Sequence, residues 1–449
     1  MARQEDGISQ LTELMSRNDP EPLYSPEPID PKLRRRRRIR AAVIAGVIVV
    51  ALVGGAGGYS AWALNAPIAA AAASTRLPNV APGAPANIGI APEGESAVSV
   101  SGADDYLGPT ASGVWMTGGG DAAVPIASIT KLITVMVILS AKPLSSADDP
   151  GPTITFSKAD HALYDKYYVQ NATIAAMPTG SSLSEHDALE TMLVASACNY
   201  AEAMAGWAFG SQSAFLSATR AWLAANGMNS TTIVEPTGID ARNTSTPGDM
   251  MILGKLAMAN PAVTQIAAMQ VLDVPGVPPV GNTNDLLGAG IVTGLKTGTL
   301  DGIGSMLLFS ANLDIGAREP LSVLGVVLGG YSHESVNLDV NALLTSIAQG
   351  FHDVPVATGG DQVGTYSTPW GESAHMVLGQ DASIFTWSDT PITATMQTTT
   401  ITTGKKGERV GTVTYAAGPR TITVPIVLDG TIAPPDDWWR LTHPSELGN

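Results

Sequence analysis

A serine and a lysine three residues apart, Ser128 and Lys131, stand near the start of an apolar stretch that reads IASITKLITVMVIL from Ile126 to Leu139. This stretch is apolar on nearly every face, which predicts a fully buried helix. Residues three apart share one helical face, with about 5–6 Å between their Cβ atoms. A serine is a weak nucleophile until a base takes its proton, and a lysine in an apolar setting can be that base. Ser128 would also lie in the first turn, where free backbone N–H groups can stabilise an oxyanion.

By itself the pair also fits a helix start whose lysine extends to solvent. Two later groups favour chemistry instead. The first reads Ser196-Ala-Cys198-Asn199, and the second reads Lys296-Thr297-Gly298-Thr299 just before a strand-like run. Ser-x-x-Lys, then Ser-x-Asn, then Lys-Thr-Gly is the motif order of the penicillin-interacting serine enzymes.

The chain therefore resembles a serine-type D-alanyl-D-alanine carboxypeptidase, a low-molecular-mass penicillin-binding protein of the β-lactamase/transpeptidase-like superfamily, over residues 96–350. Two further segments fit this family: residues 235–240, Glu-Pro-Thr-Gly-Ile-Asp, and residues 282–287, Asn-Thr-Asn-Asp-Leu-Leu. The resemblance implies no cofactor. It implies the peptidoglycan stem peptide as substrate and β-lactam antibiotics as covalent inhibitors.

The same resemblance implies acyl transfer through a covalent serine ester. Ser128 would attack the carbonyl between two D-alanines while Lys131 accepts its proton, and Ser196 would pass the proton to the leaving amine. The backbone N–H groups of Ser128 and Thr299 would form the oxyanion hole, in which one donor contributes ~2.7–4 kcal/mol. Water would then hydrolyse the ester.

The remaining motif residues would bind substrate. Lys296 and Thr297 would hold the terminal carboxylate, and Gly298 would keep the strand edge open to the peptide. Cys198 replaces the usual asparagine, whose amide can both donate and accept, whereas a thiol does each weakly. Asn199 could supply the amide through a one-residue shift, although helical geometry would point it elsewhere. Cys198 is otherwise a small buried residue.

Several functions share these residues. The leading hypothesis is a membrane-anchored D-alanyl-D-alanine carboxypeptidase. Endopeptidase or transpeptidase activity is an alternative, because the motifs do not select the acyl acceptor, and a β-lactamase is disfavoured by the anchor and the added β domain. Glu235 lies where class A β-lactamases carry a water-activating glutamate, but its context favours a structural carboxylate. A catalytically weakened peptidoglycan-binding or scaffolding homologue is the alternative that Cys198 motivates.

The charge distribution predicts a membrane protein. A net charge of −16 argues against a nucleic-acid-binding protein, whose surface would be basic. Residues 1–40 form a polar tail that ends in a Lys/Arg cluster, and residues 41–64 contain no charged side chain. This apolar run exceeds the ~20 residues needed to cross a bilayer. The basic flank predicts a cytoplasmic N-terminus and an extracellular catalytic domain; a cleaved signal peptide is the competing interpretation.

The rest of the chain divides by composition. Residues 65–95 are rich in Ala and Pro and predict a semi-extended linker, residues 96–352 an α+β catalytic domain with an inserted helical lobe, and residues 353–449 a β domain with a Trp-containing tail. The predicted strands are 97–101, 113–117, 303–311 and 321–329, and the predicted helices are 188–195, 213–226, 246–260 and 336–349. The single cysteine excludes an internal disulfide. We find no spacing typical of metal ligands and no glycine-rich phosphate loop.

Overall fold

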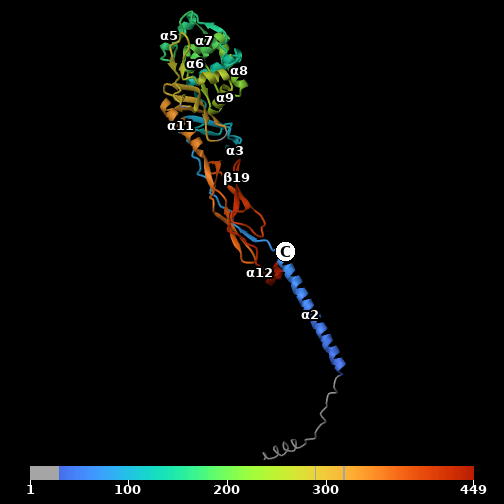
Figure 1. Cartoon of the computed structure of the whole chain (residues 1–449). Coiled ribbons are helices and arrows are strands. Elements are labelled where there is room, and N and C mark those ends of the chain that lie inside the picture. The colour runs from blue at the N-terminus through green and yellow to red at the C-terminus, as the bar shows by residue number, and fades with distance from the viewer. Residues whose placement is uncertain (1–29, 289, 317–318, 449) are drawn as a thin grey trace, which may run out of the picture.

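The computed structural model describes residues 30–288, 290–316 and 319–448. Figure 1 shows an elongated molecule with an α+β domain at one end, a β domain in the middle, and one long helix at the other end. This arrangement confirms the predicted fold class. The first 29 residues of the predicted cytoplasmic tail lie outside the described residues.

The α+β domain is built on a five-stranded antiparallel sheet in the order β10-β11-β12-β2-β3. The bounds are Val292–Leu300 for β10, Gly304–Leu313 for β11, Leu321–Gly330 for β12, Glu95–Ser101 for β2 and Met116–Gly118 for β3. Helix α11, His333–Gly350, covers one face, and α9, Pro247–Met258, covers the other. The strands read as continuous apolar runs because both faces are buried: Val323 and Val327 pack on the α11 side, Leu324 and Val326 on the opposite side.

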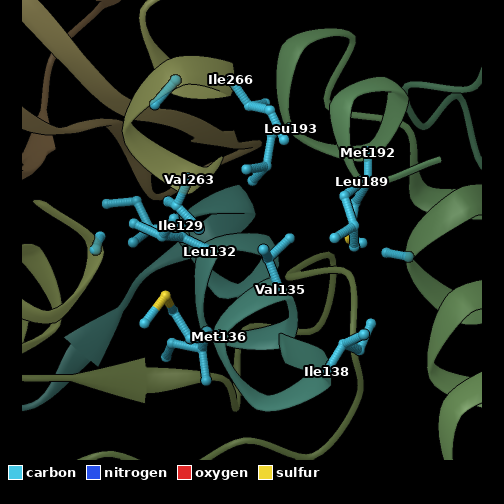
Figure 2. Packing of buried hydrophobic residues seen from close by; sticks show 14 of the residues in the cluster. Ile129, Leu132, Val135, Met136, Ile138, Leu189, Met192, Leu193, Val263 and Ile266 are labelled. Atoms are coloured by element: carbon cyan, nitrogen blue, oxygen red, sulfur yellow. The ribbon is translucent and has the colours of Figure 1, made fainter. Parts of the chain in front are cut away.

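The helical lobe surrounds α4, Thr130–Ala141, on which every residue from Thr130 to Leu139 is buried. Around it lie α5, Lys158–Tyr168, α6, Glu185–Val194, α7, Cys198–Phe209, and α8, Gln212–Ala225. Figure 2 shows Leu132 and Val135 of α4 among side chains of α6 and of α10, Pro261–Ala267. The predicted buried helix is thus confirmed.

Two helix boundaries differ from the sequence-based expectation. The α-helix after Pro125 begins only at Thr130, and a 3-10 turn, Ala127–Ile129, precedes it. The helix predicted over residues 246–260 ends at Met258, and a second helix that the sequence did not predict, α10, follows at once. Thr246 and Asn260 each cap a helix whose first residue is proline. The second cap, Asn260, therefore starts a new helix and is not the end of the first one.

The short elements of this domain are α3, Asp104–Leu107, and three two-stranded pairings. They are β4, Val124–Pro125, with β7, Thr244–Ser245; β5, Thr153–Thr155, with β6, Ser182–Ser184; and β8, Val271–Leu272, with β9, Val280–Gly281. A fourth two-stranded pairing, β13, Phe351–Ala357, with β16, Ala382–Trp387, opens the C-terminal domain.

The C-terminal domain packs that pair against a six-stranded sheet ordered β1-β14-β15-β19-β18-β17. The bounds are Gln362–Ser367 for β14, Ser373–Leu378 for β15, Thr393–Thr398 for β17, Arg409–Ala417 for β18 and Arg420–Asp429 for β19. The sequence Gly-Lys-Lys-Gly at residues 404–407 is typical of a turn and predicts a hairpin there. Strands β17 and β18 do pair, but β17 ends at Thr398, so the connection is longer than that prediction implied.

The predicted linker contributes a strand to this sheet. Strand β1, Ala72–Thr75, pairs antiparallel with β14, so that Ala72 lies opposite Ser367. Farther along the chain, the Ala86 N–H donates to Ser388 Oγ and the Gly89 N–H donates to Ser346 Oγ, each at 2.9 Å. The segment after the long helix is therefore held against the C-terminal domain and then against α11, rather than forming a free spacer.

The long helix α2, Pro31–Asn65, is long and apolar enough to cross a membrane, with a mean hydropathy of 2.3 in its most apolar window. The C-terminal helix α12, Asp437–Thr442, packs against its outer end (Figure 1). The Tyr59 hydroxyl donates to the Leu441 carbonyl at 2.6 Å, and the Arg440 guanidinium donates to the Ala66 carbonyl at 2.9 Å. The chain therefore returns, at its C-terminal tail, to the end of α2.

Candidate active site

The predicted nucleophile and base are in direct contact. Lys131, in the first turn of α4, is fully buried, and its Nζ donates to Ser128 Oγ at 2.9 Å and to the Thr237 carbonyl at 2.8 Å. Ser128 lies on the 3-10 turn and is half-buried. A serine hydroxyl hydrogen-bonded to a buried amine is the arrangement that nucleophilic catalysis requires.

A loop from Glu235 to Asn243 holds this pair in place. Gly238 has a φ of +89°, and a Cβ added there would overlap the carbonyl oxygen of Ala127, the residue before the serine. Ala127 itself has a φ of 46°, in the left-handed region that non-glycine residues rarely adopt. The Glu235 carboxylate accepts hydrogen bonds from the Gly238 N–H at 2.6 Å and from Asn243 Nδ2 at 2.9 Å. Glu235 therefore folds the loop, which is the structural role favoured from sequence.

Strand β10 places the Lys-Thr-Gly motif beside the serine. A Cβ added at Gly298 would lie 3.0 Å from the backbone N of Ser128, so a side chain at this position would push the strand away from the nucleophile turn. The sequence analysis predicted that Gly298 keeps the strand edge open to substrate. The structure shows a second reason for a glycine here, namely the close packing of β10 against the turn that carries Ser128. Thr299 Oγ1 lies 2.6 Å from Nε2 of His333, the first residue of α11.

Sequence reasoning missed His333, because nothing in the motifs points to a residue on α11. The sequence feature that could have placed His333 is the capping box formed by Ser332 and Ser335, which marks the start of a helix directly after a core strand. Burial lowers the pKa of His333, and the charge on Lys296 lowers it further, against the opposite effect of Asp285. His333 thus ties the end of the motif strand to α11 in a largely neutral form near neutral pH.

Lys296 lies close enough to Lys131 for the two charges to interact. Its ammonium is buried, and Nζ is 3.4 Å from Thr297 Oγ1, whose hydroxyl in turn hydrogen-bonds the Thr283 hydroxyl. Burial first, and the nearby Lys131 ammonium second, lower the pKa of Lys296 to about 7, against the opposite effect of Cys198. A proton can therefore leave Lys296 near neutral pH.

The middle motif lies between helices α6 and α7. Ser196 is buried at the break between α6 and α7, with a φ of 54°. Cys198 is buried at the start of α7, near enough to Lys296 for its thiol to affect that residue's pKa. Asn199 is engaged elsewhere: its side chain accepts from the Ala175 N–H at 3.1 Å and donates to the Ala175 carbonyl at 2.8 Å.

The described parts define an α+β domain in which a Ser–Lys pair on a buried helix faces a Lys-Thr-Gly strand. Residues 110–330 match the model of the D-alanyl-D-alanine carboxypeptidase family. This match confirms the resemblance found from the three motifs, and the domain that these residues form belongs to that family of serine peptidases.

Solved structures show the same fold. Penicillin binding protein 6B from Escherichia coli aligns with a TM-score of 0.51 at 20% identity, over 76% of this chain and 99% of that protein. Penicillin binding protein 5 from Haemophilus influenzae aligns with a TM-score of 0.50 at 18% identity, over 78% of this chain and 99% of that protein.

Two curated relatives carry the name D-alanyl-D-alanine endopeptidase. The one from Pseudomonas aeruginosa is 35% identical over 146 residues, which is 32% of this chain and 43% of the relative. The one from Escherichia coli is 31% identical over 173 residues, which is 37% of this chain and 52% of the relative. The chain thus spans about half the length of these relatives.

Proposed function

We propose that the chain is a membrane-anchored D-alanyl-D-alanine carboxypeptidase that removes the terminal D-alanine from peptidoglycan stem peptides. The hydrogen bond between Lys131 Nζ and Ser128 Oγ is the observation that carries this proposal. The family match over residues 110–330 supports the substrate class. In this proposal residues 96–352 are the catalytic domain, and β-lactams are covalent inhibitors that acylate the same serine.

In the acylation step Lys131 takes the proton of the Ser128 hydroxyl as Oγ bonds to the peptide carbonyl. The developing oxyanion accepts hydrogen bonds from the backbone N–H groups of Ser128 and Thr299. The C–N bond then breaks, and the proton that Lys131 took up passes through the Ser196 hydroxyl to the amine of the departing D-alanine. Water hydrolyses the serine ester and regenerates the hydroxyl.

The substrate's carboxylate would bind at Lys296 and Thr297. Since the pKa of Lys296 is near 7, the free site holds this lysine only partly charged at neutral pH. An arriving carboxylate favours the charged form of Lys296 by direct attraction. Two adjacent buried ammonium groups repel each other. When the substrate carboxylate pairs with a charged Lys296, Lys131 is therefore the lysine that accepts the serine proton.

An endopeptidase is the second candidate, because both curated relatives carry that name. The two activities differ in whether the leaving group is a free D-alanine or a cross-linked peptide. Mass spectrometry of the products from a stem pentapeptide and from a cross-linked dimer distinguishes them. Release of D-alanine from the pentapeptide supports the carboxypeptidase, and cleavage of the dimer alone would overturn it.

Ser128→Ala should abolish covalent labelling by a fluorescent penicillin. The parent chain is expected to gain the mass of one ring-opened penicillin, because only an activated serine forms this ester. Intact-mass analysis of both proteins after the same incubation checks the result. An unlabelled parent would remove the enzyme hypothesis and leave the alternative of a peptidoglycan-binding homologue.

Cys198→Asn should acylate about two- to tenfold faster than the parent, because an amide offers the substrate both a donor and an acceptor and one such bond contributes ~0.5–1.5 kcal/mol. The second-order acylation rate with a penicillin measures this change. Asn199→Ala is the companion variant: it should lower the melting temperature, since the Asn199 amide holds Ala175, and change the rate less. A slower Cys198→Asn together with a collapse in Asn199→Ala would make Asn199 the working amide.

For the membrane topology we propose that residues 41–64 of α2 span the membrane, with the N-terminus in the cytoplasm. Residues 32–40 carry most of the positive charge of the N-terminal segment, and this flank stays on the cytoplasmic side. Protease added to intact cells should remove the catalytic domain and leave the first forty residues protected. Loss of the N-terminal segment instead would reverse the orientation.

A further inference from the structure

Helix α6 carries a histidine and two carboxylates in its first two turns, outside the proposed active site. One donor atom from each of His186, Asp187 and Glu190 lies within 4.8 Å of the others. His186 Nδ1 is 3.8 Å from Asp187 Oδ1 and 4.0 Å from Glu190 Oε2. An imidazole nitrogen with two carboxylate oxygens is a donor set that suits zinc and related divalent metals.

The burial of Glu190 separates this group from an ordinary acidic helix start. Carboxylates in a first turn are expected beside the helix dipole, which accounts for Asp187. Glu190 lies one turn farther on and is only 4% exposed, and its Oε1 is buried without a hydrogen-bond partner in the described part of the chain. A buried carboxylate is costly unless something neutralises it.

The surroundings supply more negative charge and little positive charge. Among the ion pairs formed by described residues, the only basic side chain within 4.0 Å of Glu190 is His186. Asp273, which follows strand β8, is near enough for its charge to act on Glu190. The two carboxylates of Asp187 and Glu190 thus lie beside one imidazole, and a cation would offset their repulsion.

We propose that His186, Asp187 and Glu190 bind one divalent transition-metal ion, with Zn²⁺ preferred and water as the remaining ligand. Zinc bonds to nitrogen and oxygen are ~2.0–2.2 Å long, so modest rotation of the three side chains brings the donors into range. The Asp187 side chain is 36% exposed and gives the ion a path from solvent. Calcium fits less well, because it takes ~6–8 oxygen ligands, whereas this site offers one nitrogen and few oxygens.

Such an ion would hold the first two turns of α6 together. Helix α6 ends at Val194, two residues before Ser196, so its position also determines where the middle motif begins. Zinc should therefore stabilise the lobe that carries the motif. The ion has no part in the acyl-transfer steps.

Titration calorimetry of the full-length chain in detergent, after treatment with a chelator, tests the site with Zn²⁺ alone. We expect one ion per chain and a rise in melting temperature on zinc addition. Glu190→Gln and His186→Ala should each weaken binding at least about tenfold and remove the zinc-dependent rise. Glu185→Gln is the matched control: Glu185 is also buried on α6 with an unpartnered Oε1, but it is not part of the ligand group, and this variant should bind zinc as the parent does.

Absence of saturable zinc binding to the parent would overturn the proposal, as would binding that Glu190→Gln and Glu185→Gln weaken equally. Should Glu190→Gln fail to fold, Asp187→Asn replaces it, because Asp187 is the more exposed ligand. Unchanged zinc affinity in that variant and in His186→Ala would equally overturn the site. Zinc binding is measured without a peptidase assay, so its outcome is independent of the proposed function.

Discussion

Lys131→Met should slow acylation by a penicillin by about 10²–10⁴-fold, the range that a positioned general base contributes. In the structure Lys131 is the residue whose amine hydrogen-bonds the Ser128 hydroxyl, so its removal leaves the nucleophile protonated. Methionine is chosen because it fills the buried space that the lysine stem occupies on α4. The second-order acylation rate, measured with a fluorescent penicillin beside a melting curve, checks the prediction.

Lys142→Ala is the control for that experiment. Lys142 follows α4 directly and is exposed, with its ammonium 5.8 Å from the centre of the Trp207 ring. It should acylate at the parent rate. If Lys131→Met also acylates at the parent rate while remaining folded, the base is another group, and Lys296 is the first to test.

Gly238→Ala should remove acylation and destabilise the domain strongly. A Cβ at this position would overlap the Ala127 carbonyl, which is backbone and cannot rotate away. Relief of the overlap requires movement of the turn that carries Ser128 or of the loop that holds Lys131 through the Thr237 carbonyl. Both movements separate nucleophile and base. Acylation rate and melting temperature are the measurements.

Gly227→Ala is a matched control, because it separates the cost of a side chain in a left-handed backbone conformation from the cost of overlap with a neighbouring backbone. Gly227 has a φ of +77°, similar to that of Gly238, but a Cβ there would meet nothing within 4 Å. This variant should lose only the ~1–2 kcal/mol that a left-handed residue with a side chain costs, with acylation preserved. Equal losses in the two variants would show that conformation alone, and not the packing against Ala127, explains the effect.

The three motifs and the apolar pattern predicted the fold class and the Ser128–Lys131 contact, because both depend on short-range spacing. The 3-10 turn at Ala127–Ile129 could not be read the same way. That turn depends on Gly238 and Glu235, residues about a hundred positions away, which pack against it in the folded domain.

Long-range partners explain the other differences. Strand β1 has neither alternating polarity nor β-branched residues apart from Thr75, and only its pairing with β14, far along the chain, makes it a strand. The proposed zinc ligands include a histidine and a glutamate four apart, which share a helical face, but this spacing alone does not predict a metal site. The burial of this glutamate, which makes the group unusual, could not be seen before the segment after β8 was placed beside α6.

The contact between the C-terminal tail and α2 determines how far Ser128 lies from the end of α2. Strand β1 and helix α12 fasten the C-terminal domain from two directions to the segment that leaves α2 (Figure 1). If α2 lies in the bilayer, as proposed, the folded C-terminal domain sets the distance between Ser128 and the membrane. A flexible tether would instead let Ser128 sample a wide range of heights. Under the proposed function, the serine then reaches stem peptides only within a narrow range of distances from the lipid surface.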